Sequence, residues 1–154
     1  MIEVRQAVPA DTPALCAFET VQRHVDVPFD ATGTPMPEYV GAAVESGECH
    51  VAIFNGELAG LVILNYSFFG FGFVALLITR ERFRRKGIGS ALIRFVEGTC
   101  RTERIFISTE RSNGPMQMLL DALGYERSGV IENLGEDVEP ELIYVRKLRT
   151  RAPR

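Results

Sequence analysis

Six consecutive residues carry the clearest chemical signal in the sequence. Residues 84–89 read Arg-Arg-Lys-Gly-Ile-Gly, and they follow an apolar stretch and precede a helical pattern. Glycines let the backbone come close to a ligand and present several amide N–H groups to one oxyanion, while the flanking cations neutralise further phosphate charge. A helix N-terminus adds its own preference for anions. The pattern therefore predicts a diphosphate site.

Two well-known phosphate motifs do not account for this segment. The sequence has no Gly-x4-Gly-Lys-Ser/Thr motif, and the third glycine of a dinucleotide-binding fingerprint would fall at Leu92. Glu110 lies about twenty residues further on, at the end of the next expected strand, where that fingerprint carries its ribose-binding acid. A nucleotide-dependent enzyme therefore stays open as an alternative.

The elements that must position residues 84–89 follow from hydrophobic periodicity and turn residues. Asn55-Gly56 is typical of a tight hairpin turn, and the prolines and glycine of residues 26–37 predict a loop. We expect strands at residues 2–5, 51–54, 58–64, 72–79, 104–108, near 130 and at 142–148, and helices at residues 12–24, 38–46, 88–101 and 113–123.

This order, β-α-α-β-β-β-α-β-α-β-β, predicts an α/β (α+β) fold with a single mixed sheet of about seven strands. The hairpin at Asn55-Gly56 requires antiparallel neighbours, and the crossover helices at residues 88–101 and 113–123 require parallel ones near the middle of the sheet.

Length and composition favour one soluble globular domain. The chain has 154 residues, 46% of them hydrophobic and 24% charged, and we expect residues 1–148 to form the domain and residues 149–154 a basic tail. Three scattered cysteines fit neither a disulfide framework nor a metal site, which favours a reducing, cytoplasmic location. The start of the sequence resembles no signal peptide, and no apolar run approaches membrane-spanning length, so we expect no membrane insertion.

The basic residues are concentrated in two places. Ten of the seventeen lie within residues 80–86 and 146–154, which leaves 7 basic against 19 acidic residues elsewhere, or about −12. A pI near 5.5 argues against nucleic-acid binding. The tail is typical of a solvated terminus, whereas the cluster at residues 80–86 adjoins the expected anion site.

Together with a second motif, residues 84–89 resemble the GNAT superfamily of acyl-CoA-dependent N-acyltransferases. The first family signature is Arg or Gln followed by x-x-Gly-x-Gly or Ala, and the second is Asn-x-x-Ala-x-x-Leu-Tyr-x-x-x-Gly-Phe. The matching residues are Arg84, Gly87 and Gly89 for the first and Asn113, Leu119, Gly124 and Tyr125 for the second. The resemblance covers about residues 72–148, and the first 70 residues match in element order alone.

The resemblance implies an N-acetyltransferase that uses acetyl-CoA as co-substrate and a primary amine as acceptor. The backbone amides of residues 85–90 would hold the CoA pyrophosphate, and the edge of the strand at residues 77–79 would pair with the pantetheine arm. The implied cofactor-binding residues are Leu77, Ile78, Thr79, Arg84, Arg85, Lys86, Gly87, Ile88, Gly89, Ser90 and Asn113. Leu77 and Ile78 are equally expected in a core, and both roles are compatible because the strand would bind through its backbone.

Two catalytic positions of the family are changed in this chain. Deprotonating a primary amine with a pKa near ~10.4 costs roughly 4 to 5 kcal/mol at pH 7, so a base is useful. Many relatives carry a glutamate on the strand before the phosphate loop, but this strand has no carboxylate, and Ala75 lies where one is expected. The tyrosine with which relatives protonate the departing sulfur is replaced by Leu120.

Replacements for these groups come from the remaining polar residues. Glu110 is the candidate base and Tyr125 the candidate acid, although Glu110 also suits a helix N-terminus and Tyr125 a packed aromatic after a helix. His24 has a suitable pKa next to the loop expected to border the acceptor site, but it also fits a solvated helix end. His50 is expected to be structural, and a water relay to solvent is a further alternative.

The acceptor is not specified by the sequence, and a small amine, a polyamine, an aminoglycoside and a peptide N-terminus all stay open. An acidic run could attract a cationic acceptor or be a solvated loop; it comprises Glu132, Glu136, Asp137, Glu139 and Glu141. The resemblance leaves a homodimer open. Because the usual base and acid are absent, an acyl-CoA-binding sensor without transferase activity is the main alternative to an enzyme.

Overall fold

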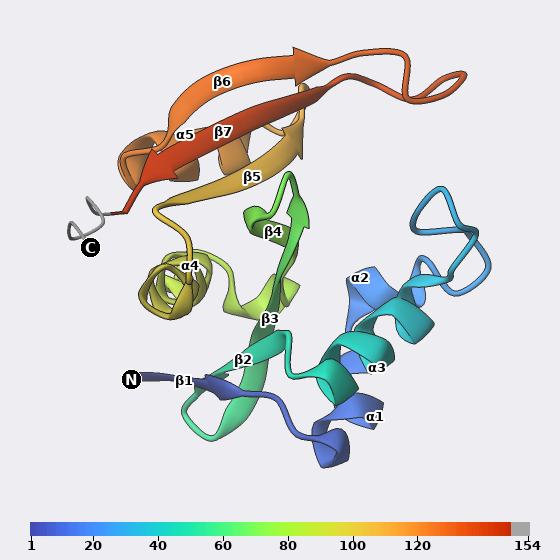
Figure 1. Ribbon diagram of the computed structural model, residues 1–154. Coiled ribbons are helices and arrows are strands. Elements are labelled where there is room, and N and C mark those ends of the chain that lie inside the picture. The colour runs from blue at the N-terminus through green and yellow to red at the C-terminus, as the bar shows by residue number, and fades with distance from the viewer. Residues whose placement is uncertain (149–154) are drawn as a thin grey trace. The chain divides into compact units, whose positions relative to one another are not determined.

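The computed structural model describes residues 1–148, so the expected basic tail at residues 149–154 lies outside the described residues (Figure 1). The strands are β1 (Ile2–Gln6), β2 (Cys49–Phe54), β3 (Glu57–Phe68), β4 (Phe71–Thr79), β5 (Arg104–Glu110), β6 (Glu126–Ile131) and β7 (Glu141–Lys147). The α-helices are α1 (Thr12–Cys16), α2 (Glu19–Gln22), α3 (Met36–Ser46), α4 (Ile88–Thr99) and α5 (Gly114–Ala122), and the 3-10 helices are η1 (Pro9–Asp11) and η2 (Glu81–Phe83).

The strands form one seven-stranded sheet in the order β1-β2-β3-β4-β5-β7-β6. Strand β4 runs parallel to β5, and the antiparallel pairs include β1 with β2, β2 with β3, β5 with β7, and β6 with β7. The predicted fold class, a single mixed sheet, is therefore confirmed, with a parallel pair at the crossover through α4. The parallel neighbours expected from the helix at residues 113–123 are wrong, because β7 lies between β5 and β6 and is antiparallel to both.

The predicted hairpin at Asn55-Gly56 is confirmed as well. Both residues have positive φ, 49° and 84°, and the turn joins Phe54 to its partner Glu57. Two consecutive positive φ values are the requirement that favours Asn-Gly in two-residue hairpins. A second such turn, at Phe69-Gly70 with φ of 53° and 78°, joins β3 to β4. As a result β3 extends to Phe68, four residues past the predicted end.

The single helix predicted at residues 12–24 is wrong. The chain forms two short helices, α1 and α2, and Phe18 between them has an extended ψ of 140°. The Phe18 side chain is 1% exposed. Burial of this ring accompanies the interruption, which periodicity cannot reveal because Leu15, Phe18 and Val21 keep helical spacing across it.

The predicted start of the next helix also needs correction. Helix α3 begins at Met36, two residues before the expected Glu38, and Pro37 lies in its first turn. The first N–H groups of a helix have no partner within the helix, so proline is tolerated there. Pro37 therefore belongs to a helix start and not to the end of a loop.

The described residues form two compact units. Unit 1 contains Met1–Leu64 and Leu76–Val96, and unit 2 contains Asn65–Ala75 and residues 97–148. Both units have apolar cores of fully or nearly buried side chains. Those of unit 1 include Leu15, Phe18, Val21, Val40, Leu61, Ile63, Ile88, Leu92 and Ile93, and those of unit 2 include Ile105, Ile107, Leu120, Leu142 and Tyr144.

Candidate functional site

The turn that precedes α4, in unit 1, has an unusual backbone. Arg85 and Gly87 have positive φ values of 63° and 82°. The carbonyl oxygen of Gly87 accepts the first helical hydrogen bond, from the amide of Ala91 at 3.0 Å. A left-handed arginine is disfavoured sterically, and such conformations concentrate at functional sites. The first turn of α4 contains no acidic residue that could compete for its amides. This backbone suits an anion, and an anion site here stays a prediction.

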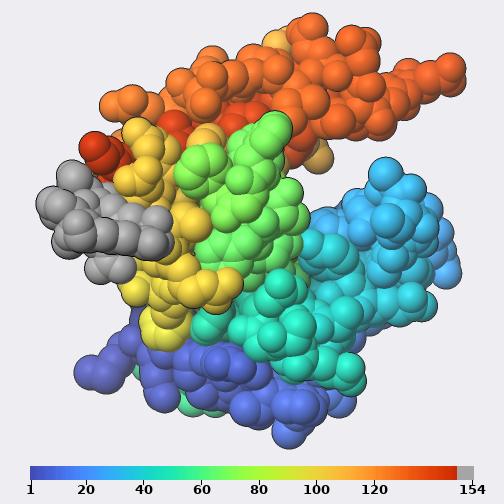
Figure 2. Space-filling view, in the orientation of Figure 1, coloured from blue at the N-terminus to red at the C-terminus, as the bar shows by residue number. Residues whose placement is uncertain are grey.

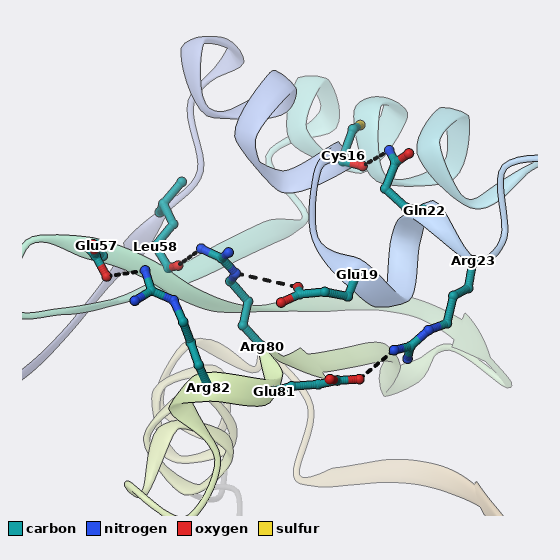
Figure 3. A network of polar contacts seen from close by, with 9 residues as sticks. All are labelled: Cys16, Glu19, Gln22, Arg23, Glu57, Leu58, Arg80, Glu81 and Arg82. Atoms are coloured by element: carbon teal, nitrogen blue, oxygen red, sulfur yellow. Dashed lines mark hydrogen bonds and ion pairs between the residues drawn. The ribbon is translucent and has the colours of Figure 1, made fainter.

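Two cations of the basic cluster are committed to ion pairs within unit 1 (Figure 3). The Arg80 guanidinium lies 3.6 Å from the Glu19 carboxylate and donates to the Leu58 carbonyl oxygen at 3.4 Å. Arg82 and Glu57 form an ion pair at 2.5 Å. These two arginines thus link the segment before α4 to α2 and β3.

Glu81, the acidic residue within this cluster, is paired in a similar way. Its carboxylate accepts a hydrogen bond from Arg23 at 2.6 Å, and the charge-assisted contact lowers the pKa of Glu81 (Figure 3). The acid within the cluster is thereby neutralised by a residue outside it.

Arg84, Arg85 and Lys86 are the cations left for a ligand. All three are exposed, and none forms an ion pair with another residue of the described chain. The Lys86 ammonium lies 5.6 Å from the centroid of the Phe54 ring, within the range of a cation–π contact. Unpaired positive charge therefore adjoins the amides at the start of α4.

Gly60 of β3 permits close packing beside this turn, a role that the sequence analysis did not identify. A Cβ atom at Gly60 would lie 2.7 Å from the carbonyl oxygen of Ile78, 2.9 Å from Cγ2 of Ile88 and 3.2 Å from Cδ1 of Leu92. Contacts under 3.0 Å to carbon do not occur in relaxed structures, and the nearest atom belongs to a backbone that cannot rotate away. Gly60 thus sets how closely the end of β4 and the start of α4 approach β3.

Gly60→Ala is expected to lower the free energy of unfolding by about 1 to 3 kcal/mol, because the added methyl group overpacks a filled site. Urea denaturation measures the change. Gly98→Ala is the matched control: Gly98 lies in α4 with nothing within 4 Å of the added carbon, so this substitution should stabilise the protein by about 0.5 to 1 kcal/mol. Equal stability of Gly60→Ala and wild type would contradict the packing argument.

In unit 2, Asn113 begins helix α5. Its Oδ1 accepts a hydrogen bond from the Met116 amide at 3.2 Å, which makes Asn113 the N-cap. Leu120, on the same helix, is fully buried in the core. The position at which many relatives carry a tyrosine as general acid is therefore occupied in this chain by a buried core residue.

Glu110, the predicted base, ends β5 and lies directly opposite Glu141 of β7 in the antiparallel register. Glu110 is exposed and Glu141 is half-buried. Burial raises the pKa of Glu141, the neighbouring carboxylates of Glu110 and Glu139 raise it further, and a hydrogen bond with Ser108 opposes them. Glu141 is thereby held closer to the protonation range of a base that operates near neutral pH.

Glu139 differs from Glu141 although it is only two residues away. The Ser112 amide donates to its carboxylate at 2.7 Å and the Ser112 hydroxyl donates at 2.8 Å. These hydrogen bonds lower the pKa of Glu139. Neighbouring carboxylates whose environments shift their pKa values in opposite directions are typical of acid–base sites.

Tyr125, the predicted acid, is 5% exposed and donates its hydroxyl to Glu97 at 2.7 Å. The same carboxylate pairs with Arg146 at 2.9 Å. This arrangement suits the alternative role foreseen from the sequence, a packed aromatic after the helix. A catalytic role for Tyr125 stays a prediction.

The two histidines both lie in unit 1. The Nδ1 atom of His24 lies 2.8 Å from the carbonyl oxygen of Thr20, just beyond the end of α2. His50 packs against Phe95 with ring centroids 5.2 Å apart, and burial lowers its pKa. His50 is thus neutral at pH 7, in line with a structural role.

Glu141 is the titratable residue that sequence reasoning missed as a candidate base. It was grouped with the acidic run, of which Glu132, Glu136 and Asp137 are exposed between β6 and β7, the orange surface segment of Figure 2. Glu141 differs from the other residues of the acidic run because it lies opposite Glu110. This position depends on the strand register, which the spacing of residues in the sequence does not determine.

Two further properties concern residues 1–148 as a whole. No group of three His, Cys, Asp or Glu side chains in this range is arranged to hold a metal ion. No helix in this range combines the length and hydrophobicity needed to cross a bilayer.

Comparison with known proteins gives consistent matches. N-alpha-acetyltransferase 30 from Xenopus laevis is 30% identical over 88 residues, which are 51% of this chain and 32% of that protein, so the chain spans about a third of this relative. A GNAT-family acetyltransferase from Bacillus cereus is 28% identical, with a TM-score of 0.81 over 96% of this chain and 97% of that one.

A third relative was solved with a ligand. The yncA protein of Salmonella typhimurium, whose structure contains its cofactor acetyl-CoA, superimposes with a TM-score of 0.78 at 17% identity over 100% of this chain and 98% of that one. The sequence model described as "Acetyltransferase (GNAT) family" matches residues 17–125. The chain therefore belongs to the GNAT acetyltransferase family.

Proposed function

We propose that this protein transfers an acetyl group from acetyl-CoA to the nitrogen of a primary amine. The observation that carries the proposal is the turn before α4, in which Arg85 and Gly87 have positive φ and three exposed cations make no ion pair within residues 1–148. Family membership supports acetyl transfer. The N-alpha-acetyltransferase relative supports nitrogen as the acceptor atom, although it matches over 88 residues only.

The pyrophosphate of acetyl-CoA binds the amides of residues 85–90. Positive φ at Arg85 and Gly87 bends the backbone before α4, and the dipole of this twelve-residue helix favours the same anion. Arg84, Arg85 and Lys86 neutralise the remaining phosphate charge. Pre-formed amides need no reorganisation on binding, which strengthens their contribution.

The pantetheine arm pairs with the end of β4. Residues Gly72, Phe73 and Val74 form the parallel pairs with β5, and β4 continues beyond them through Leu77, Ile78 and Thr79. A strand can extend its hydrogen bonding to a ligand as it does to another strand. Backbone amides near Leu77 and Ile78 then hold the oxyanion that develops on the thioester carbonyl.

The reaction proceeds by direct attack. The bound ammonium first loses a proton to solvent water, at a cost of roughly 4 to 5 kcal/mol at pH 7. The neutral amine nitrogen then forms a bond to the thioester carbon, the carbonyl electron pair moves to oxygen, and the tetrahedral intermediate collapses with cleavage of the carbon–sulfur bond. The electron pair of that bond leaves on sulfur as a thiolate, a fair leaving group because thiols have a pKa of about 8.5.

The proton on nitrogen passes to a carboxylate of the Glu110–Glu141 pair. Attack makes the nitrogen strongly acidic, so a carboxylate can accept its proton even though it could not deprotonate the free ammonium. We assign this role to Glu141, whose raised pKa suits a base, with Glu110 beside it to attract the cationic acceptor.

One alternative has specific support. Because Leu120 is buried and Tyr125 is bonded to Glu97, the chain offers no tyrosine acid at the family position, as a binding module that has lost catalysis would. Incubation with acetyl-CoA and a panel of primary amines distinguishes the two functions. We expect free thiol to form at a rate that depends on the amine, measured with a thiol reagent. Tight binding of acetyl-CoA without amine-dependent thiol would support the module instead.

A further inference from the structure

Unit 2 carries a group of phenylalanine rings that neither the core nor the proposed catalysis uses. The Phe68 ring stacks on Phe73, with centroids 5.4 Å apart and planes at 19°, and lies 4.9 Å from Phe106. The Phe71 ring lies 5.3 Å from Phe106. Phe73 and Phe106 are register partners in the parallel pair of β4 and β5. We call Phe68, Phe71, Phe73 and Phe106 the aromatic face.

The aromatic face is not part of the buried core. All four rings are partly exposed, and Phe69 in the adjoining turn is 86% exposed. On the opposite side of the same strands, Val74, Ile105 and Ile107 are 3%, 0% and 2% exposed. One side of the sheet in unit 2 is therefore sealed, while the other presents aromatic carbon to its surroundings. These partly exposed rings, with the exposed Phe69 beside them, form a candidate interaction surface.

The aromatic face continues into the proposed catalytic pair. Side chains two residues apart on a strand share a face, so Phe106, Ser108 and Glu110 of β5 point to the same side. Glu141 is the register partner of Glu110 and shares that side as well. Four residues at about 3.3 Å each place the Cα atoms of Phe106 and Glu110 roughly 13 Å apart. One face thus bears aromatic rings at one end and carboxylates at the other.

Building on the proposed function, we propose that the acetyl acceptor is a small arylalkylamine, a primary amine joined by a short chain to an aromatic ring. The ring packs on the aromatic face, and the ammonium group lies at Glu110 and Glu141 before transfer. The opposite character of the two ends complements the two ends of such a molecule, a cation and a flat apolar group.

A peptide fits this surface less well. The backbone N–H and C=O groups of a sheet bond within its plane, to neighbouring strands, so its face offers side chains alone. Between the aromatic face and the carboxylates, the residues of this face on β5 and β7 are Ser108 and its register partner Ile143. Peptide groups laid across them would lose water without gaining enough hydrogen bonds. The surface therefore favours an acceptor with a single polar group.

Steady-state acetylation of 4-phenylbutylamine and n-butylamine by the 154-residue chain tests the inference. We expect kcat/KM to be about tenfold higher for the phenyl compound, because ring packing on the aromatic face stabilises its transition state. Equal values would overturn the inference but leave acetyl transfer intact. Absence of acetyl-CoA binding by calorimetry would instead overturn the proposed function.

Variants locate the effect. Phe73→Leu keeps an apolar side chain but removes the stacked ring, and we expect it to lower the ratio of kcat/KM for 4-phenylbutylamine to that for n-butylamine by about fivefold. Phe95→Leu is the matched control, since Phe95 is also partly exposed and contacts the ring of His50 in unit 1, and its preference should equal that of wild type. An unchanged preference in Phe73→Leu would overturn the assignment. So would a higher kcat/KM for the tripeptide Phe-Gly-Gly than for 4-phenylbutylamine.

Discussion

Gly89→Trp is expected to raise the Kd for acetyl-CoA at least about a hundredfold while the protein stays folded. Gly89 lies in the first turn of α4 and is partly exposed, so we expect an indole there to fill the space in front of the amides. Hydrogen bonds to a charged group contribute about 1.5 to 3 kcal/mol each, and the loss of two accounts for the expected factor.

Isothermal titration calorimetry measures the affinity, and circular dichroism checks the fold. Gly98→Trp is the matched control, because Gly98 lies in the same helix, is exposed and has open space around it. Its Kd should equal that of wild type. If Gly89→Trp binds acetyl-CoA as tightly as Gly98→Trp does, the pyrophosphate does not lie at the start of α4.

Glu141→Gln is expected to lower kcat by about a hundredfold or more, the usual contribution of a general base. The free energy of unfolding, in contrast to kcat, should not fall in this variant. The folded-state pKa of Glu141 is raised, so its contribution to stability is present below the unfolded pKa and is lost as the pH rises through the folded value. At pH 8 a neutral glutamine should therefore be at least as stable as the wild-type residue, which separates a catalytic loss from a structural one.

The pH dependence of the wild-type enzyme supplies a second signature. A base is inactive when protonated, so kcat should fall as the pH drops through the raised pKa of Glu141. Ser108→Ala removes a hydrogen bond that lowers this pKa, and the acidic limb should move to higher pH. Glu139→Gln removes a like charge, and the limb should move to lower pH.

Glu136→Gln is the control for these profiles, because Glu136 is exposed and lies outside the Glu110–Glu141 pair. Its profile should match wild type. A wild-type kcat in Glu141→Gln would remove Glu141 from the mechanism and leave Glu110 or a water relay as the base. The same conclusion would follow if the acidic limbs of Ser108→Ala, Glu139→Gln and Glu136→Gln all fell at the same pH.

Much of the fold could be predicted because its signals are local. Asn55-Gly56 determines a turn through its two positive φ values, and the buried stripe of Ile88, Leu92 and Val96 determines a helix against a sheet. The failures were not local. The interruption at Phe18 and the turn at Phe69-Gly70 depend on how buried rings and strand pairing fit together, for which the sequence has no standard marker.

The candidate site divides in the same way. Residues 84–89 predict an anion site because the glycines, the cations and the helix start are adjacent in the chain. The pairing of Glu110 with Glu141, the close packing at Gly60 and the ring contacts of Phe68 with Phe73 and Phe106 each join residues from different strands or helices. Such contacts follow from register and twist, which one sequence does not determine.

A crystal structure of this protein with bound CoA tests the central claim most directly. We predict the pyrophosphate oxygens within hydrogen-bonding distance of main-chain nitrogens between Arg85 and Ser90, with Arg84 or Lys86 beside them. A CoA molecule whose pyrophosphate contacts none of these nitrogens would contradict the account.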